Sequence, residues 1–218
     1  MSHTLTAREE ILARIRAALP DLKVPAEASH ASIPRSYGRL SHLDRQACLQ
    51  LFIDRLLDYD TEVIELTDAT GLSAAIEQTL RNAGEDSLLV PAGPLQMLVP
   101  DGVNSYVDHG LTTPELGRAQ AVLTSCEAAV ASTGTIFLVH GETQGRRVLT
   151  LLPDHHICIV RRSQVYGSIP EGLAALATQS KKLITSISGP SATSDIEMVR
   201  IRGVHGPRRL TVLLYGDS

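Results

Sequence analysis

The sequence has no tryptophan and only 3% aromatic residues, so few side chains are available to stack on nucleic-acid bases. It also lacks an excess of lysine and arginine, and its formal net charge is -4. Nucleic-acid-binding domains are usually basic, because they bind a polyanion. The composition therefore argues against DNA or RNA as the main partner.

Cysteine is scarce as well. The three cysteines, Cys48, Cys126 and Cys158, are odd in number and far apart, and no C-x-x-C pair occurs. This pattern excludes a disulfide framework and a C-x-x-C metal or redox motif. A chain without disulfides fits a reducing compartment, and we therefore expect a cytoplasmic location.

Long hydrophobic runs are absent too. No stretch approaches the ~18 consecutive apolar residues of a membrane span. Residues 1–20 include Glu9 and Glu10 and lack the apolar core of a secretion signal. We expect neither a membrane span nor a Sec-type leader.

From about residue 60 onward, short apolar runs alternate with amphipathic segments. The predicted helices cover residues 70–83 and 170–182, and the predicted strands cover residues 62–66, 87–91, 121–125, 135–140, 147–153, 156–160, 182–187 and 210–215. Runs without strict alternation indicate strands covered on both faces, as in parallel sheets. Residues 141–145 are typical of a hairpin turn. We predict an α/β fold with an open mixed, mostly parallel sheet flanked by helices.

Two further helices precede this sheet. Thr6 and Glu9 form a capping-box pattern at the start of an amphipathic helix that ends at Pro20. Residues 20–39 have little periodicity and read as an arm, and a second helix begins near Ser41 and reaches about Tyr59. We predict an N-terminal helix and connecting arm over residues 1–40 and one domain over residues 41–218.

The first candidate site follows the predicted strand 121–125. Ser132, Thr133, Gly134 and Thr135 offer hydroxyls and backbone N–H groups in a turn whose glycine permits close approach of an anion. A plain turn between strands explains the same residues. Glu127 lies at the end of the strand, where it is either a candidate general base or a surface carboxylate.

The second candidate site is the stretch from Ile187 to Pro207, around whose start six of the eleven residues from Thr185 to Asp195 carry hydroxyl groups. Gly189 and Pro190 indicate a turn, and Ser194 and Glu197 fit a capping box. With Asp195, this segment is either a structural turn or a loop that binds a ligand with hydroxyl groups.

His205 and Arg147 complete the candidates. His205 with Ser191 and Asp195 would imitate a hydrolytic triad, but no G-x-S-x-G motif accompanies them. A metal site from Asp195, Glu197 and His205, with His155 or His156, lacks the usual ligand spacing, so we assign no metal. A histidine that caps a turn explains His205 equally well. Arg147 is either a solvated loop residue or a clamp for a carboxylate or phosphate.

Three segments, taken in order, resemble a known family. They are AVASTGTIFLV, GRRVLTLLPDHHICIV and SGPSATSDIEMVRIRGVHGPRRLTVLLY. Over residues 40–216 their order and spacing are similar to the LUD domain family, and within it to the LutC-type (YkgG-like) lactate-utilization proteins. The resemblance implies a fold like that of NagB, RpiA and CoA transferases, which agrees with the predicted sheet.

The resemblance also implies a function. LutC-type proteins act with LutA-type and LutB-type iron–sulfur proteins in the oxidation of L-lactate to pyruvate, so an accessory or substrate-handling subunit is implied. The chain has no C-x-x-C pair and no ferredoxin-like cysteine extension. We therefore expect no cofactor in this chain and iron–sulfur clusters only in its partners.

The alternative is a stand-alone enzyme of the CoA-transferase-like fold. Its substrate would be a small anion such as a carboxylate, CoA thioester, sugar phosphate or folate, and Glu127 would be its nucleophile or base.

Carried over to this sequence, the family's site falls on the candidates derived above. It comprises Glu127, Thr133, Gly134, Thr135, Arg147, Gly189, Pro190, Ser191, Thr193, Asp195, Glu197, His205 and Gly206. We expect the two loops to meet in one polar pocket beyond the carboxyl ends of the strands, where ligands bind in open α/β sheets.

Overall fold

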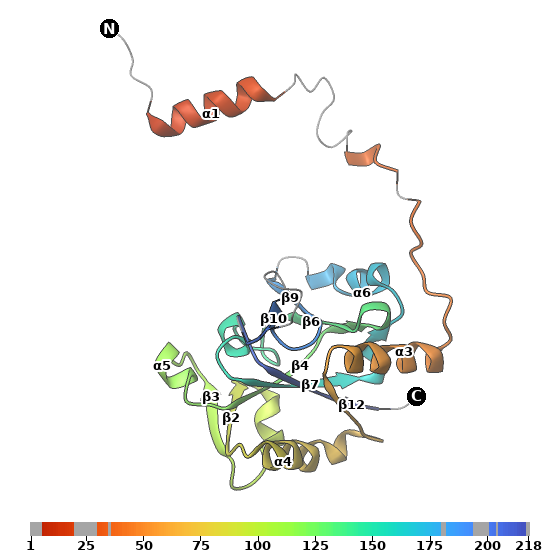
Figure 1. Cartoon of the computed structure of the whole chain (residues 1–218), viewed down its shortest axis with the longest axis vertical. Coiled ribbons are helices and arrows are strands. Elements are labelled where there is room, and N and C mark those ends of the chain that lie inside the picture. Colours follow the sequence, from red (N-terminus) through yellow and green to blue (C-terminus); the bar gives the residue numbers. More distant parts are fainter. Residues whose placement is uncertain are drawn as a thin grey trace. The chain divides into compact units, whose positions relative to one another are not determined.

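The computed structural model describes residues 6–19, 30–34, 36–179, 182–193, 201–203 and 205–216. The chain divides into two compact units, Met1–Gly38 and Arg39–Ser218 (Figure 1). Within the described ranges, no helix is both long enough and apolar enough to cross a membrane.

The first unit contains helix α1 (Ala7–Ala18). The Thr6 hydroxyl accepts a hydrogen bond from the Glu9 backbone, and the Glu9 carboxylate accepts one from the Thr6 backbone at 2.8 Å. The predicted capping box is therefore confirmed. None of the residues of α1 is buried, and its apolar residues Ile11 and Ile15 are exposed.

The second unit is built around a six-stranded sheet in which every neighbouring pair is parallel. Its strands, in spatial order, are β1 (Glu62–Glu65), β12 (Arg209–Tyr215), β7 (His155–Arg161), β4 (Ala121–Ser125), β2 (Ser87–Pro91) and β3 (Asn104–Asp108). This arrangement confirms the predicted α/β class with a mostly parallel sheet.

Helices cover both faces of this sheet, as the apolar runs predict. Helices α3 (Arg45–Asp58) and α4 (Leu72–Ala83) lie on opposite sides of it (Figure 1). Alternate residues of β12 enter different cores: Val212 packs with residues of α3, and Leu213 packs with residues of α4. A strand buried on both faces has no polar face, which explains its continuous apolar sequence.

The ends of both helices follow from local sequence. The Asp44 side chain accepts a hydrogen bond from the Ala47 backbone at 2.8 Å and so starts α3. Helix α4 ends at Gly84, whose φ of 68° is left-handed and costs glycine little. Both boundaries lie close to those predicted.

A second, four-stranded sheet packs on the α3 side. Its order is β8 (Val165–Tyr166), β5 (Ala128–Val130), β6 (Thr135–Val139) and β9 (Ile184–Ile187). Ile136 and Leu138 of β6 share a core cluster with residues of α3 and β12. The pairs β5–β6 and β6–β9 are antiparallel, so the antiparallel pairing expected in one mixed sheet belongs to this separate sheet.

The predicted strand over residues 147–153, and the hairpin turn before it, are wrong. Residues Arg147–Thr150 form a 3-10 helix, η4. The Gly145 N–H donates to the Gly141 carbonyl, and Leu149 packs on Leu89 and Val122 of the main sheet. One short helical turn buries Leu149 as well as a strand would, and a short apolar run does not distinguish the two.

The remaining elements are short. The helix predicted over residues 170–182 is described as α6 (Ile169–Ala175) followed by η6 (Ala177–Gln179). The others are α5 (Thr113–Leu116), η1 (Ala69–Gly71), η2 (Pro94–Leu98), η3 (Ala131–Thr133), η5 (Arg162–Gln164), β10 (Ala192–Thr193) and β11 (Ile201–Arg202).

Candidate functional site

A cavity of about 280 Å³ lies between η4, the segment that runs from β9 to Ala192, and the turn that enters β12. We call it the Arg147 cavity. Its described lining is Arg147, Thr150, Leu151, His156, Thr185, Ser186, Ile187, Ser188, Gly189, Pro190, Ser191, Ala192, His205, Gly206, Pro207, Arg209 and Leu210. Six of the predicted site residues line it, namely Arg147, Gly189, Pro190, Ser191, His205 and Gly206.

The cavity lies at the amino ends of strands, not at the carboxyl ends where we expected it. His156 and Leu210, which are the second residues of β7 and β12, both line it. The loop after β9 is drawn to this edge because the Ser191 N–H donates to the Pro207 carbonyl at 2.8 Å, just before β12 begins. The position rule for parallel sheets did not apply, because the loop follows a strand of the second sheet.

Backbone hydrogen bonds hold the loop from Ser191 to Gly206. The Ser191 carbonyl accepts from the Gly203 N–H at 2.8 Å, and Thr193 of β10 pairs with Ile201 of β11. The Ser191 Oγ accepts from the backbone N–H of His205 at 3.2 Å. In this structure Ser191 thus closes the turn. Asp195 and Glu197, together with the capping box of residues 194–197, lie outside the described residues.

The first predicted loop reaches the cavity through a chain of hydroxyls. Thr133 Oγ1 and Thr135 Oγ1 lie 2.7 Å apart, and Thr135 Oγ1 lies 2.8 Å from Ser188 Oγ. Ser188 lines the cavity, whereas Thr133 and Thr135 do not. The structure therefore brings the two loops together, with the first loop behind the cavity wall.

Gly134 has a packing reason to be glycine. Its φ is 59°, and a Cβ atom there would lie 2.9 Å from Arg55 Cβ and 3.1 Å from the Arg55 backbone carbon of α3. The close approach is made by a helix, and Gly134 lines none of the cavities described here.

Glu127 lies apart from these residues. It is partly buried, its backbone N–H donates to the Phe137 carbonyl at 2.9 Å, and it too lines none of these cavities. The residue expected to act as a base or nucleophile therefore has no place in the Arg147 cavity.

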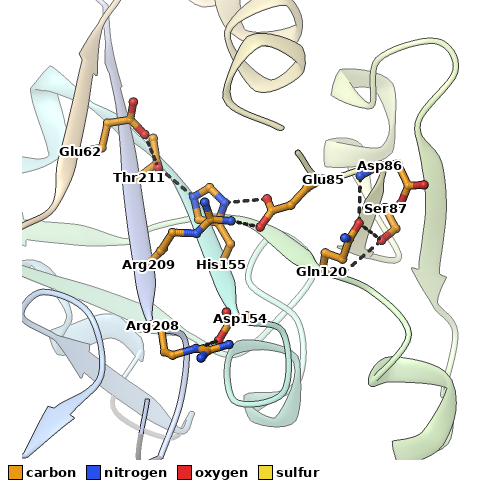
Figure 2. A network of polar contacts seen from close by, with 10 residues as sticks. All are labelled: Glu62, Glu85, Asp86, Ser87, Gln120, Asp154, His155, Arg208, Arg209 and Thr211. Carbon is orange, nitrogen blue, oxygen red and sulfur yellow. Dashed lines mark hydrogen bonds and ion pairs between the residues drawn. The ribbon is translucent and has the colours of Figure 1, made fainter. Parts of the chain in front are cut away.

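The charged side chains in the described lining of the Arg147 cavity are cations, and several of its other polar side chains are hydroxyls. Its described lining contains Arg147 and Arg209 but no carboxylate. Arg209 is paired with Glu85 outside the cavity (Figure 2), whereas Arg147 forms no ion pair with any residue that the structure describes. Arg147 Nη1 donates to the hydroxyl of Thr185. The cavity thus offers a guanidinium with unused donors to a ligand.

One of the two histidines that line the cavity, His156, is neutral. Burial and, to a smaller extent, the nearby His155 together lower the pKa of His156 to about 3, so the ring carries no charge near neutral pH. Its Nε2 lies 2.8 Å from the Thr124 hydroxyl. In the described part of the chain, no three His, Cys, Asp or Glu side chains gather in a way that could hold a metal ion.

A second cavity, of about 350 Å³, does lie at carboxyl ends, those of β2 and β3. We call it the Asp108 cavity. His140 and Arg146 line it with Asp108. Arg146 donates from Nε at 2.8 Å and from Nη2 at 2.6 Å to the two Asp108 oxygens. Both oxygens of Asp108 therefore already accept hydrogen bonds from Arg146.

The Asp108 carboxylate should make the stability of the folded protein depend on pH in the acid range. Burial alone would raise the pKa of Asp108, but hydrogen bonds from Arg146 and from the Gly110 and Leu111 backbones, with the Arg146 charge, lower it overall. A lowered folded-state pKa contributes stability above the ordinary range of aspartate, near 4, and this contribution is lost as the pH falls through the folded value. We expect Asp108→Asn to cost about 1–2 kcal/mol at pH 7.

Urea unfolding at pH 7 and pH 3 checks this expectation. The wild type and Asp108→Asn should differ at pH 7, and the difference should shrink as the pH falls below the ordinary range of aspartate. Asp101→Asn, at an exposed aspartate, is the control and should match the wild type at pH 7. A difference between Asp108→Asn and the wild type that is as large at pH 3 as at pH 7 would show that the ionic pair is not its cause.

Three residues of this region were missed by sequence reasoning. Thr185 and His140 bond each other, at 2.7 Å, and Arg209 lines the Arg147 cavity. His140 ends a predicted strand and Thr185 lies in the hydroxyl-rich segment, but nothing local links them, because they are 45 positions apart.

Comparison with known proteins places the chain in a family. The LUD domain matches residues 8–215. The chain belongs to the LUD domain family. A Deinococcus radiodurans protein named lactate utilization protein C is 43% identical over 202 residues, which cover 91% of this chain and 87% of that protein. The Bacillus velezensis protein of the same name is 26% identical, covering 100% and 99% of the two chains.

Two further relatives agree with this family assignment. Escherichia coli YkgG is 25% identical to this LUD domain protein, covering 82% of this chain and 84% of YkgG. The crystal structure of a DUF162 family protein from Deinococcus radiodurans superposes with a TM-score of 0.69 at 40% identity, covering 80% of this chain and 99% of that chain. The resemblance to LutC-type and YkgG-like proteins is thereby confirmed.

Proposed function

We propose that this LUD domain protein takes part in lactate utilization and binds a small monocarboxylate, such as L-lactate or pyruvate, in the Arg147 cavity. The observation that carries the proposal is the lining, which combines Arg147 with hydroxyl groups and contains no carboxylate among its described residues. The names of the relatives supply the metabolic setting.

The size of the cavity supports a small ligand. Its volume of about 280 Å³ lies at the lower limit of the roughly 300–1,000 Å³ that is usual for small-molecule sites. The guanidinium of Arg147 presents several N–H donors in one plane. It therefore binds a carboxylate ligand better than it binds a neutral ligand. Hydroxyls of Ser188 and Ser191 in the same lining suit the second oxygen function of lactate or pyruvate.

We propose further that the chain is an accessory or substrate-handling subunit that acts in the cytoplasm with LutA-type and LutB-type iron–sulfur proteins, which hold the clusters. The cysteines of this chain support the proposal that its partners, and not this chain, hold the clusters. Burial raises the pKa of Cys158 to about 12 and that of Cys126 well above its usual range. Cluster ligation needs thiolates, and these thiols are kept protonated inside a hydrophobic core.

Replacing Arg147 with alanine should weaken binding of pyruvate and L-lactate by about 10- to 100-fold, since a hydrogen bond to a charged group contributes roughly 1.5–3 kcal/mol. Isothermal titration calorimetry measures this directly. Arg118→Ala is the matched control, because Arg118 is exposed and lines none of the described cavities. Equal affinity in Arg147→Ala and the wild type, or no binding to the wild type, would rule out the cavity as the carboxylate site.

Reconstitution tests the subunit role. Lactate oxidation by the iron–sulfur proteins should rise when this chain is added, and the rise should be smaller with Arg147→Ala than with Arg118→Ala. Oxidation that is unaffected by the chain would contradict the accessory role while leaving the binding result intact.

A further inference from the structure

A line of three bonded side chains joins the Arg147 cavity to the Asp108 cavity. Arg147 Nη1 donates to Thr185 Oγ1, and the same oxygen lies 2.7 Å from His140 Nε2. Arg147 and Thr185 line the first cavity, whereas His140 lines the second. Thr185 is buried, so its hydroxyl is shared between these partners and the cavity rather than with bulk water.

The chemistry of the partners fixes most of the protons in this line. A guanidinium only donates, so Thr185 accepts from Arg147. A carbonyl only accepts, so His140 Nδ1, which lies 3.0 Å from the Gly145 carbonyl, carries a proton. The direction of the bond between Thr185 and His140 Nε2 is then set by whether Nε2 also carries a proton.

We propose that His140 couples proton uptake to anion binding in the Arg147 cavity through the hydroxyl of Thr185. The inference rests on the proposed function and identifies how that same site is regulated. When His140 is neutral, Thr185 donates its only proton to Nε2, away from the cavity. When a proton from solvent binds Nε2, the ring donates to Thr185, and the Thr185 O–H turns toward the cavity as a second donor beside Arg147.

Other charged groups face the two ends of this line. His140 shares the Asp108 cavity with Glu142 and with the Asp108–Arg146 pair, whose charges already balance. At the other end, His205 lines the Arg147 cavity, and its protonation would also favour an anion. The experiment must therefore separate His140 from His205, and the hydroxyl relay from the simple charge of the ring.

The affinity of the wild type for pyruvate and L-lactate should increase about tenfold as the pH falls from 8 to 5, the range in which histidines as a class gain a proton, for one added charge-assisted hydrogen bond. Because linkage is reciprocal, binding should take up a proton. Calorimetry in buffers of different ionisation enthalpy measures that uptake, and repeated titrations measure the pH profile.

Four variants and one control, His109→Gln, identify the groups responsible. His140→Gln and Thr185→Val should each lose most of the pH dependence of binding. Thr185→Val retains the ring of His140. It therefore removes the hydroxyl that links His140 to the cavity but leaves any charge on the ring. Thr185→Ser, which keeps the hydroxyl, and His205→Gln should both retain the pH dependence. His109→Gln, at an exposed histidine outside the described cavities, should match the wild type.

Several results would overturn this inference. If binding to the wild type did not depend on pH, the role of His140 would be refuted, but the proposed function would not be affected. An undiminished pH dependence in Thr185→Val would assign the effect to charge, and its loss in His205→Gln would assign it to His205. Failure of both pyruvate and L-lactate to bind the wild type at every pH would refute the inference together with the proposed function.

Discussion

Replacing Gly134 with alanine should destabilise the protein by about 2–5 kcal/mol. Two costs add: a left-handed conformation costs a residue with a Cβ atom roughly 1–2 kcal/mol, and overpacking costs about 1–3 kcal/mol more. The new Cβ would lie 2.9 Å from Arg55 Cβ and 3.1 Å from the backbone of α3, so the helix would have to move. Urea unfolding at pH 7 measures the loss.

Gly84→Ala is the matched control for this prediction. Gly84 has a similar φ of 68°, but nothing lies within 4 Å of its Cβ position, so only the conformational cost of about 1–2 kcal/mol remains. The comparison also addresses the role of Gly134 itself. If Gly134→Ala proved as stable as Gly84→Ala yet lost carboxylate binding, Gly134 would be a ligand residue and the packing explanation would be wrong.

Replacing Glu85 with alanine should cost about 1–3 kcal/mol, because it removes the ion pair of Arg209 and leaves the buried ring of His155 without a hydrogen-bond partner. Glu85 lies in the turn between α4 and β2 at the amino edge of the main sheet (Figure 2). Its carboxylate pairs with Arg209 and accepts from His155 Nδ1 at 2.8 Å. The side chains of Glu85 and His155 are 6% and 2% exposed, whereas that of Arg209 is 44% exposed, so most of the loss should come from the buried His155 ring.

Counting protons explains why this network depends on Glu85. Thr211 donates to Glu62 at 2.8 Å, so its oxygen must accept from His155 Nε2, also at 2.8 Å. At the other side of the ring, Nδ1 lies 2.8 Å from the Glu85 carboxylate, which also pairs with Arg209. The carboxylate therefore joins His155 and Arg209 in one network.

Glu77→Ala provides the control, because Glu77 and Arg81 form an exposed pair one helical turn apart. Such pairs contribute about 0.3–0.5 kcal/mol, so the variant should be nearly as stable as the wild type. Unfolding of both variants by urea gives the comparison. A Glu85→Ala protein no less stable than Glu77→Ala would mean that the network at this edge is not stabilising.

Local patterns predicted much of the fold because the interactions that they report are local. The capping residue Thr6 and the glycine that ends α4 act within one helical turn, and the structure has both in these roles, whereas α3 begins at Arg45 and not near Ser41. The apolar runs of β7 and β12 predicted strands covered on both faces. Residues 147–153 were assigned wrongly because an isolated short apolar run has no period that separates strand from helix.

The sequence by itself determined the α/β class, the family, the absence of C-x-x-C ligands and a set of candidate residues rich in hydroxyls. Only the tertiary structure decided which of those residues share a cavity, since Arg147 and Thr185 are 38 positions apart and Glu85 and His155 are 70 apart. These contacts depend on β12 pairing with β7 and on a second sheet that carries β9 to the amino edge. Such pairings depend on the packing of the whole domain, and no local spacing encodes them.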